Sequence, residues 1–213
     1  WLHYRGPTAD GAAAESLRVP ASGKLPLLWK VNVGVGTSSV VVRGGRLYTQ
    51  GHKDGAEYVR CLDAANGSQV WEFHQPVSLD PNLFEGGSRS TPTLAGENLY
   101  SLSHEGHLLC LEALSGKVLW QRHLIKDFGG RRPDWGFSGA PLVADGLLYV
   151  DCGGVGSSTI ALDAGNGQLV WKSGTDKAGY AAPLILNVAG KPTLLMFKGS
   201  VLAGLEPSSG REL

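Results

Sequence analysis

The sequence lacks the charge imbalance and the long apolar runs that mark several large functional classes. Its 213 residues hold 19 basic and 19 acidic side chains, so the formal net charge is zero. A general nucleic-acid binder needs a basic face, and a membrane-spanning helix needs about 18 consecutive apolar residues. The sequence has neither, so we expect no nucleic-acid partner and no membrane-spanning segment.

Cysteine and catalytic signatures are equally scarce. Cys61, Cys110 and Cys152 show no CxxC spacing, which argues against zinc and favours small buried apolar side chains. No G-x-S-x-G elbow and no Walker loop occurs. His104 and His107 stand three residues apart across a glycine turn, but two imidazoles do not complete a metal site. We therefore predict no catalytic residue and no metal ligand.

Glycine and tryptophan, by contrast, belong to a pattern that occurs four times. An acidic residue is third in each copy, and these residues are spaced by 49, 51 and 43 positions: Asp63, Glu112, Asp163 and Glu206. A glycine is always seventh: Gly67, Gly116, Gly167 and Gly210. The first three copies end in Trp71, Trp120 and Trp171. Each copy predicts a strand, a tight turn and a second strand, because the acid can accept backbone N–H bonds and glycine supplies a positive φ.

Two further strand-like runs precede each copy, so each repeat is expected to hold four short antiparallel strands. Four strands in a repeat of about 40–50 residues indicate a β-propeller blade. We predict an all-β fold, a β-propeller of four-stranded antiparallel blades with about four blades present as a partial ring. The expected boundaries are 1–37 for an N-terminal segment and 38–73, 88–122, 138–173 and 180–213 for the blades, the last one truncated.

The repeat resembles the pyrrolo-quinoline-quinone (PQQ) repeat, with its tryptophan-docking motif, of PQQ-like β-propeller proteins. The opening residues Trp1–Gly11 are similar to the start of envelope proteins of this family, which includes the propeller lipoprotein of the outer-membrane protein assembly machine. The resemblance implies that each tryptophan stacks on the motif of the adjacent blade. It also implies a closed ring of seven or eight blades.

Both ends of the sequence favour a partial ring. Trp29 resembles the tryptophan of a last blade strand, but no turn motif precedes it, so we expect an orphan outer strand there. The fourth motif would place its tryptophan at position 214, one residue beyond Leu213. The sequence opens on Trp1 without an apolar leader, which indicates a removed signal peptide or a start within a longer reading frame. We expect a fragment whose partners include missing C-terminal blades of its own chain.

The loops that join consecutive blades carry the candidate site, because function on repeat scaffolds concentrates in such loops. They comprise residues 80–89, 126–138 and 173–180. Mixed charge with exposed aromatic side chains is typical of a face that binds a protein or a small ligand. The predicted face consists of Arg89, Lys126, Asp134, Trp135, Lys177 and Tyr180. A second interpretation stays open, in which Arg89, Trp135 and Tyr180 only join blades near the axis.

The resemblance implies two functions of different classes. The first is a non-catalytic scaffold that binds proteins of the bacterial cell envelope, in the periplasm or at the outer membrane, without a cofactor. The second is a fragment of a quinoprotein alcohol dehydrogenase that depends on PQQ and calcium. Such enzymes typically have an adjacent Cys-Cys pair at the cofactor, which this sequence lacks. Envelope propellers that bind sugars or polymers form a third class.

Overall fold

The computed structural model describes residues 1–14, 16, 19–80 and 85–213. Within these ranges, fifteen strands form four antiparallel sheets, and each sheet takes its strands in chain order. The first sheet holds β1 (Val41–Arg43), β2 (Arg46–Lys53), β3 (Ala56–Asp63) and β4 (Gln69–Pro76). The second holds β5 (Thr93–Ala95), β6 (Asn98–Leu102), β7 (His107–Glu112) and β8 (Val118–His123). The predicted all-β fold is confirmed.

The remaining strands repeat this arrangement. The third sheet holds β9 (Leu142–Ala144), β10 (Leu147–Gly154), β11 (Ser157–Asp163) and β12 (Leu169–Ser173). The fourth sheet has three strands in the described residues: β13 (Leu184–Val188), β14 (Lys191–Phe197) and β15 (Leu202–Leu205). A short helix, α1 (Leu124–Phe128), begins the linker between β8 and β9, where the sequence indicated a loop. No helix in the described ranges is long and apolar enough to cross a membrane.

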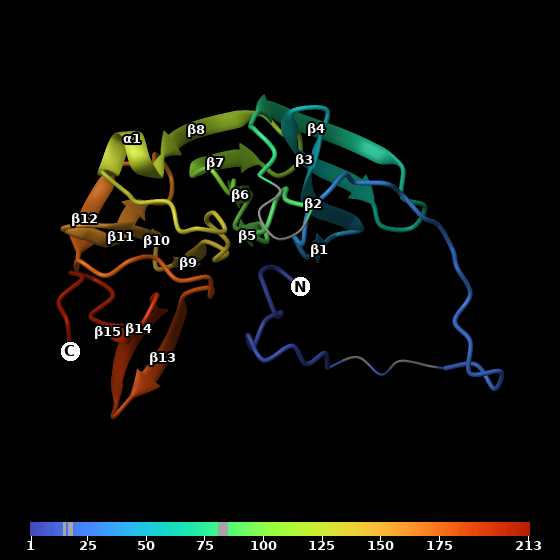
Figure 1. Ribbon diagram of the computed structural model, residues 1–213. Helices are drawn as coiled ribbons and strands as arrows, with labels where there is room; N and C mark the ends of the chain where they lie inside the picture. Colours follow the sequence, from blue (N-terminus) through green and yellow to red (C-terminus); the bar gives the residue numbers. More distant parts are fainter. Residues whose placement is uncertain (15, 17–18, 81–84) are drawn as a thin grey trace.

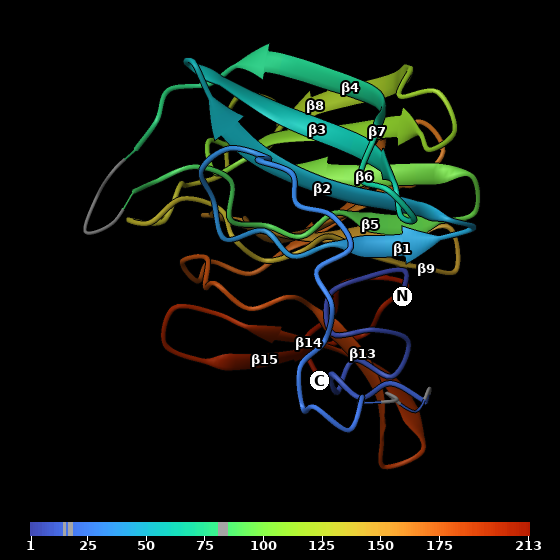
Figure 2. The ribbon, with the colours of Figure 1, turned by 90° about the vertical axis from the view of Figure 1, so that its right-hand side faces the viewer.

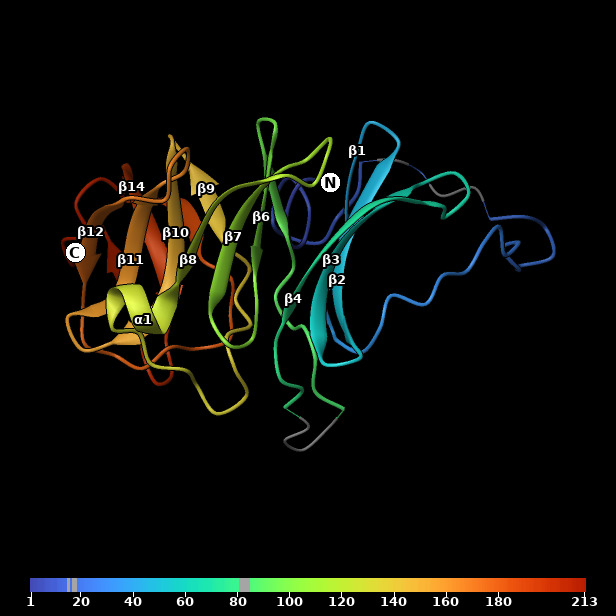
Figure 3. The ribbon, with the colours of Figure 1, turned by 90° about the horizontal axis from the view of Figure 1, so that it is seen from above.

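The sheets fan around a common centre, as the blades of a propeller do. Figure 1 shows β1, β5, β9 and β13 on the inner side of this arc, with β4, β8 and β12 on the outer side. Figure 2 shows the sheet of β1–β4 lying over its neighbour, and Figure 3 shows the sheets side by side in chain order. The N-terminal residues lie near the centre of the arc (Figure 1). The inner strands and the linkers that lead into them therefore converge on one region.

The repeated turn has nearly identical geometry in all four copies. Each seventh-position glycine donates its N–H to the carbonyl of the acidic residue at 2.8 Å, with φ between 69° and 76°. The Asp63 carboxylate accepts the N–H of Ala65, as the sequence predicted. The Glu112 carboxylate instead accepts the hydroxyl of Ser115, because the longer side chain reaches past the nearest amides. The turn thus requires a positive φ at its glycine, while the acidic side chain bonds a backbone N–H in the Asp copies and a serine hydroxyl in the Glu copies.

Apolar side chains fill the space between neighbouring sheets. One cluster joins the first and second sheets, another the second and third, and another the third and fourth. Cys61, Cys110 and Cys152 are buried as free thiols within the described chain. Burial of this apolar surface between sheets is the main force that holds them together.

Tryptophans mark the outer part of each junction. The indole N–H of Trp71 donates to the carbonyl of Ala113 on the next sheet at 3.0 Å, and Trp120 bonds Ala164 at the same distance. Trp171 bonds Pro207 at 2.9 Å. These distances show one junction geometry repeated along the arc.

The glycine of the next motif accommodates each indole. A Cβ atom built on Gly116 would lie 2.6 Å from the ring of Trp71, and one on Gly167 would lie 2.7 Å from the ring of Trp120. Trp29 makes the same contact with the first motif: its indole bonds the carbonyl of Ala64 at 3.1 Å, and its ring lies over Gly67. Residues 27–31 form no strand in the described structure.

Candidate functional site

Four equivalent positions, one in the segment that leads into each sheet, surround a cavity near the centre of the arc. Arg89, Ser138 and Tyr180 each stand three residues before the proline that leads into an inner strand, and Thr37 has the same place before β1. All four line a cavity of about 670 Å³. Because the fold presents one side chain per sheet at this position, the residues there set the chemistry of the cavity.

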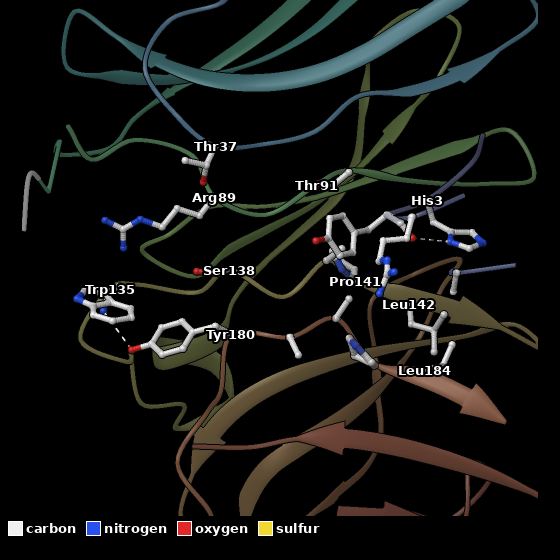
Figure 4. Close-up of a pocket in the computed structure, with 17 residues that line it drawn as sticks. His3, Thr37, Arg89, Thr91, Trp135, Ser138, Pro141, Leu142, Tyr180 and Leu184 are labelled. Atoms are coloured by element: carbon white, nitrogen blue, oxygen red, sulfur yellow. Dashed lines mark hydrogen bonds between the residues drawn. The ribbon is translucent and has the colours of Figure 1, made fainter. Parts of the chain in front are cut away.

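The cavity is elongated. Figure 4 shows Arg89, Trp135 and Tyr180 at one end and His3, Leu142 and Leu184 at the other. Arg5 also lines it, and none of the described residues in the lining is an aspartate or glutamate. The lining therefore carries positive charge at Arg5 and Arg89, and most of its other side chains are apolar or bear a hydroxyl group. A volume of this size suits a small ligand or a few residues of a peptide.

Two exposed aromatic side chains form one end of the cavity. The rings of Trp135 and Tyr180 have centroids 5.2 Å apart and are tilted by 34°. The backbone N–H of Trp135 donates a long hydrogen bond of 3.5 Å to the Tyr180 hydroxyl. The two residues are 42% and 40% exposed, although large aromatic side chains are usually buried. This aromatic pair offers a flat apolar surface to an approaching ligand.

Arg89 lies beside the aromatic pair but is 8% exposed. It donates to the carbonyl of Asp80 at 3.3 Å, and burial lowers the pKa of its guanidinium from the ordinary value. Asp80 also forms an ion pair with Arg132, which holds the pKa of the Asp80 carboxyl below its usual range. Arg132 in turn contacts Glu105 at 3.1 Å. These charges tie two linkers and the hairpin between β6 and β7 together next to the cavity.

The structure separates the six predicted face residues into two sets. Arg89, Trp135 and Tyr180 come together in the cavity. Lys126 on α1, Asp134 and Lys177 are exposed and lie outside the lining. Residues 81–84 of the first predicted loop lie outside the described residues.

His104 and His107, the two histidines noted in the sequence, have different surroundings in the structure. His104 is fully buried, with its Nε2 atom 3.0 Å from the carbonyl of Ser78. His107 instead packs against His123, with ring centroids 4.6 Å apart. Within the described chain, no group of three potential ligands is placed to hold a metal ion.

Sequence reasoning missed several contributors to this site. Thr37 and Ser138 could have been found from the register of the repeat, since they align with Arg89 and Tyr180. His3, Tyr4 and Arg5 carried no such signal, because they reach the cavity through an N-terminal segment outside the repeats. Arg132 was a loop cation without a recognisable partner until the fold brought Asp80 and Glu105 beside it.

The donor set of the cavity fits calcium poorly. Calcium takes six to eight oxygen ligands, several of them carboxylates. The described residues of the lining include no carboxylate, and Thr37, Thr91 and Ser138 supply only hydroxyls. Arg89 and the aromatic pair are compatible with an aromatic carboxylate such as PQQ, but the described lining residues do not provide the carboxylate ligands for the calcium ion that the quinoprotein interpretation requires.

The chain is similar in sequence to two kinds of known protein. Over 187 residues the chain is 27% identical to the dehydrogenase subunit of the quinone alcohol dehydrogenase of Gluconobacter oxydans, covering 81% of this chain and 24% of that protein. It is 29% identical over 89 residues to outer membrane protein assembly factor BamB of Shewanella oneidensis, covering 41% of this chain and 22% of that protein. The chain thus spans about a quarter of the length of these curated relatives.

A solved structure shows the same fold. The crystal structure of BamB from Moraxella catarrhalis superimposes with a TM-score of 0.56 and 22% sequence identity, covering 87% of this chain and 51% of that one. The family described as outer membrane protein assembly factor BamB matches residues 55–213, which include all four repeat motifs. The chain therefore belongs to the PQQ-like repeat family of outer membrane protein assembly factor BamB.

Proposed function

We propose that this chain is part of a non-catalytic scaffold that binds proteins of the bacterial cell envelope, in the periplasm or at the outer membrane. Its family membership supports this, because BamB is by its printed description an outer membrane protein assembly factor. The proposed partners are other proteins of that assembly process. In this proposal the sheets supply a rigid frame and the linkers supply the contacts.

The exposed pair of Trp135 and Tyr180 carries the proposal. Tryptophan and tyrosine are enriched among the residues that dominate binding energy at protein interfaces. Here they stand at the rim of a cavity, beside the charges of Arg132, Asp80 and Glu105. An aromatic centre flanked by charged groups matches the anatomy of a protein interface. Arg89 adds a cation at the base of the pair.

We further propose that Trp71, Trp120 and Trp171 act as docking residues that hold the sheets in the frame. Each indole packs directly over a glycine of the next motif. A side chain at that glycine would occupy the space that the indole now fills. More sheets of the same chain are also proposed as partners. Phe197 and Leu202 on the last sheet are 62% and 61% exposed, and a further sheet would cover them.

The test is capture of purified outer-membrane assembly proteins by the immobilised chain. Trp135→Ala should weaken capture by at least about tenfold, which corresponds to roughly 1.4 kcal/mol. Leu114→Ala is the matched control, because Leu114 is 74% exposed but lies in the turn at the opposite end of β7. Equal capture by both variants, each shown to be folded by circular dichroism, would refute the proposed face.

The quinoprotein alternative has one specific observation in its favour. The aromatic pair and Arg89 lie together in a chain that is 27% identical to a quinone alcohol dehydrogenase subunit. Adding PQQ and calcium and measuring dye-linked alcohol oxidation tests it directly. Turnover above that of the Trp135→Ala and Arg89→Gln variants would overturn the scaffold proposal.

A further inference from the structure

We propose that the central cavity is a peptide-binding site, in which an extended acidic segment of a partner adds to the inner edges of β9 and β13. This inference rests on the proposed scaffold function and specifies the chemistry of its partner. It depends on three features: the backbone groups of the inner edges, the way the N-terminal segment already uses two of those edges, and the charge of the lining.

The N-terminal segment shows how an extended backbone binds these edges. The carbonyl of Trp1 accepts the N–H of Val42 at 2.8 Å, and the amino group of Trp1 donates to the carbonyl of Val42 at 3.3 Å. The carbonyl of Leu2 accepts the N–H of Leu94 at 2.7 Å. Val42 lies on β1 and Leu94 on β5, so two neighbouring inner strands already receive a peptide backbone in the manner of β-strand addition.

The register places matching groups on the next two sheets. Val143 of β9 pairs with Leu148, as Val42 pairs with Leu47. Antiparallel pairs alternate between hydrogen-bonded and non-bonded, and the bonded pair here flanks the two-residue turn. The N–H of Val143 therefore points away from β10, toward the inner edge.

The same parity applies to Ile185 of β13, which pairs with Leu194. Asn187, two residues closer to the turn, pairs with Pro192. Proline has no N–H, so this pair is a non-bonded one, and the Ile185 pair has the same character. Among the described residues, neither the Val143 nor the Ile185 amide has a hydrogen-bond partner. Unpaired inner-edge amides of this kind are templates for another strand.

The cavity leads to these edges. Leu142 and Leu184, the residues before Val143 and Ile185, line its far end (Figure 4). A backbone that enters past Trp135 and Tyr180 would run along the cavity and reach both amides. Side chains on one face of that backbone would contact the aromatic pair, since alternate residues of a strand point to opposite sides.

The charge of the lining selects an acidic segment. His3, Arg5 and Arg89 line the cavity, and none of the described lining residues is an aspartate or glutamate; the negative charge of Asp80 acts on Arg89 from outside the lining. A glutamate or aspartate in the partner would meet a guanidinium in a partly desolvated place, where ion pairing is stronger than in water. A basic segment would find no carboxylate among the described lining residues, so the lining favours an acidic segment by sign.

The experiment uses the complete chain and two end-capped, fluorescein-labelled peptides. One alternates Glu with Val and carries a central Phe, and the other has Lys in place of each Glu. Fluorescence anisotropy should show micromolar binding of the acidic peptide and at least about tenfold weaker binding of the basic one. Arg89→Gln should weaken the acidic peptide about tenfold and leave the basic peptide unchanged. Equal binding of both peptides, or of neither, would overturn the proposal.

Amide hydrogen exchange of the wild-type chain provides a readout that does not depend on whether a variant folds. In the wild-type chain the acidic peptide should slow exchange at Val143 and Ile185 about tenfold, and leave Val42 and Leu94 unchanged. Val143→Pro removes one N–H from the edge without touching the β9–β10 ladder, and should abolish most of the binding. If that variant does not fold, the wild-type exchange decides. Binding without protection at either amide would refute strand addition.

The two proposals fail in different ways. If Trp135→Ala loses protein capture while Val143→Pro retains it, the scaffold proposal stands and strand addition at the cavity is wrong. If the chain oxidises alcohols with PQQ and calcium, the scaffold proposal is wrong whatever the peptides do.

Discussion

Glu57 is a buried carboxyl at the boundary between the first two sheets, and its replacement should stabilise the protein. It lies on β3 and is 3% exposed. Its Oε1 atom has no hydrogen-bond partner among the described residues. Burial raises the pKa of Glu57 to about 7; the hydroxyl of Ser88 acts in the opposite direction, and the nearby negative charge of Glu105 raises it further. Glu57→Gln keeps the shape and removes the charge.

The expected gain follows from the difference between the folded and unfolded pKa values. The pKa rises from 4.5 to about 7, and each unit corresponds to about 1.4 kcal/mol. A carboxyl with a raised folded pKa binds its proton more tightly in the folded state. Its favourable contribution is therefore fully present below pH 4.5, declines as the pH rises, and is lost above about 7. At neutral to basic pH the variant should be more stable by about 3 kcal/mol, or about 10 °C in Tm.

The measurement is urea and thermal unfolding of wild type and Glu57→Gln at several pH values between about 4 and 8. The difference between the two proteins should be near zero at the acidic end and should grow as the pH rises. Glu97→Gln is the control, because Glu97 is an exposed carboxyl in the turn before β6 and its replacement should change little. A stability difference that stays constant across this range would refute the reasoning, since only a titrating charge gives the slope.

Three further changes test the junctions between sheets. Trp120→Ala removes an indole that is 8% exposed and should lower the free energy of unfolding by about 3–5 kcal/mol in urea denaturation. Gly116→Ala adds a methyl group at φ +76° and 2.6 Å from the ring of Trp71, so it should cost at least about 1–2 kcal/mol and alter tryptophan fluorescence; an unchanged protein would contradict this packing. Lys198→Met leaves the buried Asp151 carboxylate without its partner at 2.7 Å, and should cost about 3–5 kcal/mol at neutral pH, largely restored when Asp151→Leu is added.

The junctions could be anticipated because they combine local turn chemistry with a repeated spacing. The turn role of Gly67 and its counterparts could be predicted because each follows an acidic residue by four positions. In the structure each has a positive φ and the same 2.8 Å hydrogen bond. The helix α1 could not be anticipated, because it spans five residues and depends on its cap: His123 accepts the N–H of Ile125, and Gly129 closes the end with φ 70°. A segment that short gives no 3.6-residue periodicity to detect.

Only some of the residues that line the cavity could be predicted from the sequence, because only some of them are of conspicuous types. Arg89, Trp135 and Tyr180 stood out because cationic and aromatic side chains in loops are conspicuous. Thr37 and Ser138 occupy equivalent places but are small and common residues, so only their register identifies them. His3 and Arg5 reach the cavity through tertiary contacts of Trp1 and Leu2 with the inner strands, and no local pattern encodes such contacts.

The repeat assigns stability and recognition to different positions of the same unit. At the outer junctions, four tryptophan N–H groups bond the next motif at 2.9 to 3.1 Å, so that geometry tolerates almost no variation. At the inner end, the equivalent positions hold Thr37, Arg89, Ser138 and Tyr180, which differ in size, charge and polarity. The inner position makes none of these indole–glycine contacts, so its side chains can change while the outer junctions remain intact. Ligand preference in this family should therefore follow the residue three places before each inner-strand proline. Exchanging Arg89 with Ser138 should move the cationic end of the cavity and leave the outer tryptophan junctions intact.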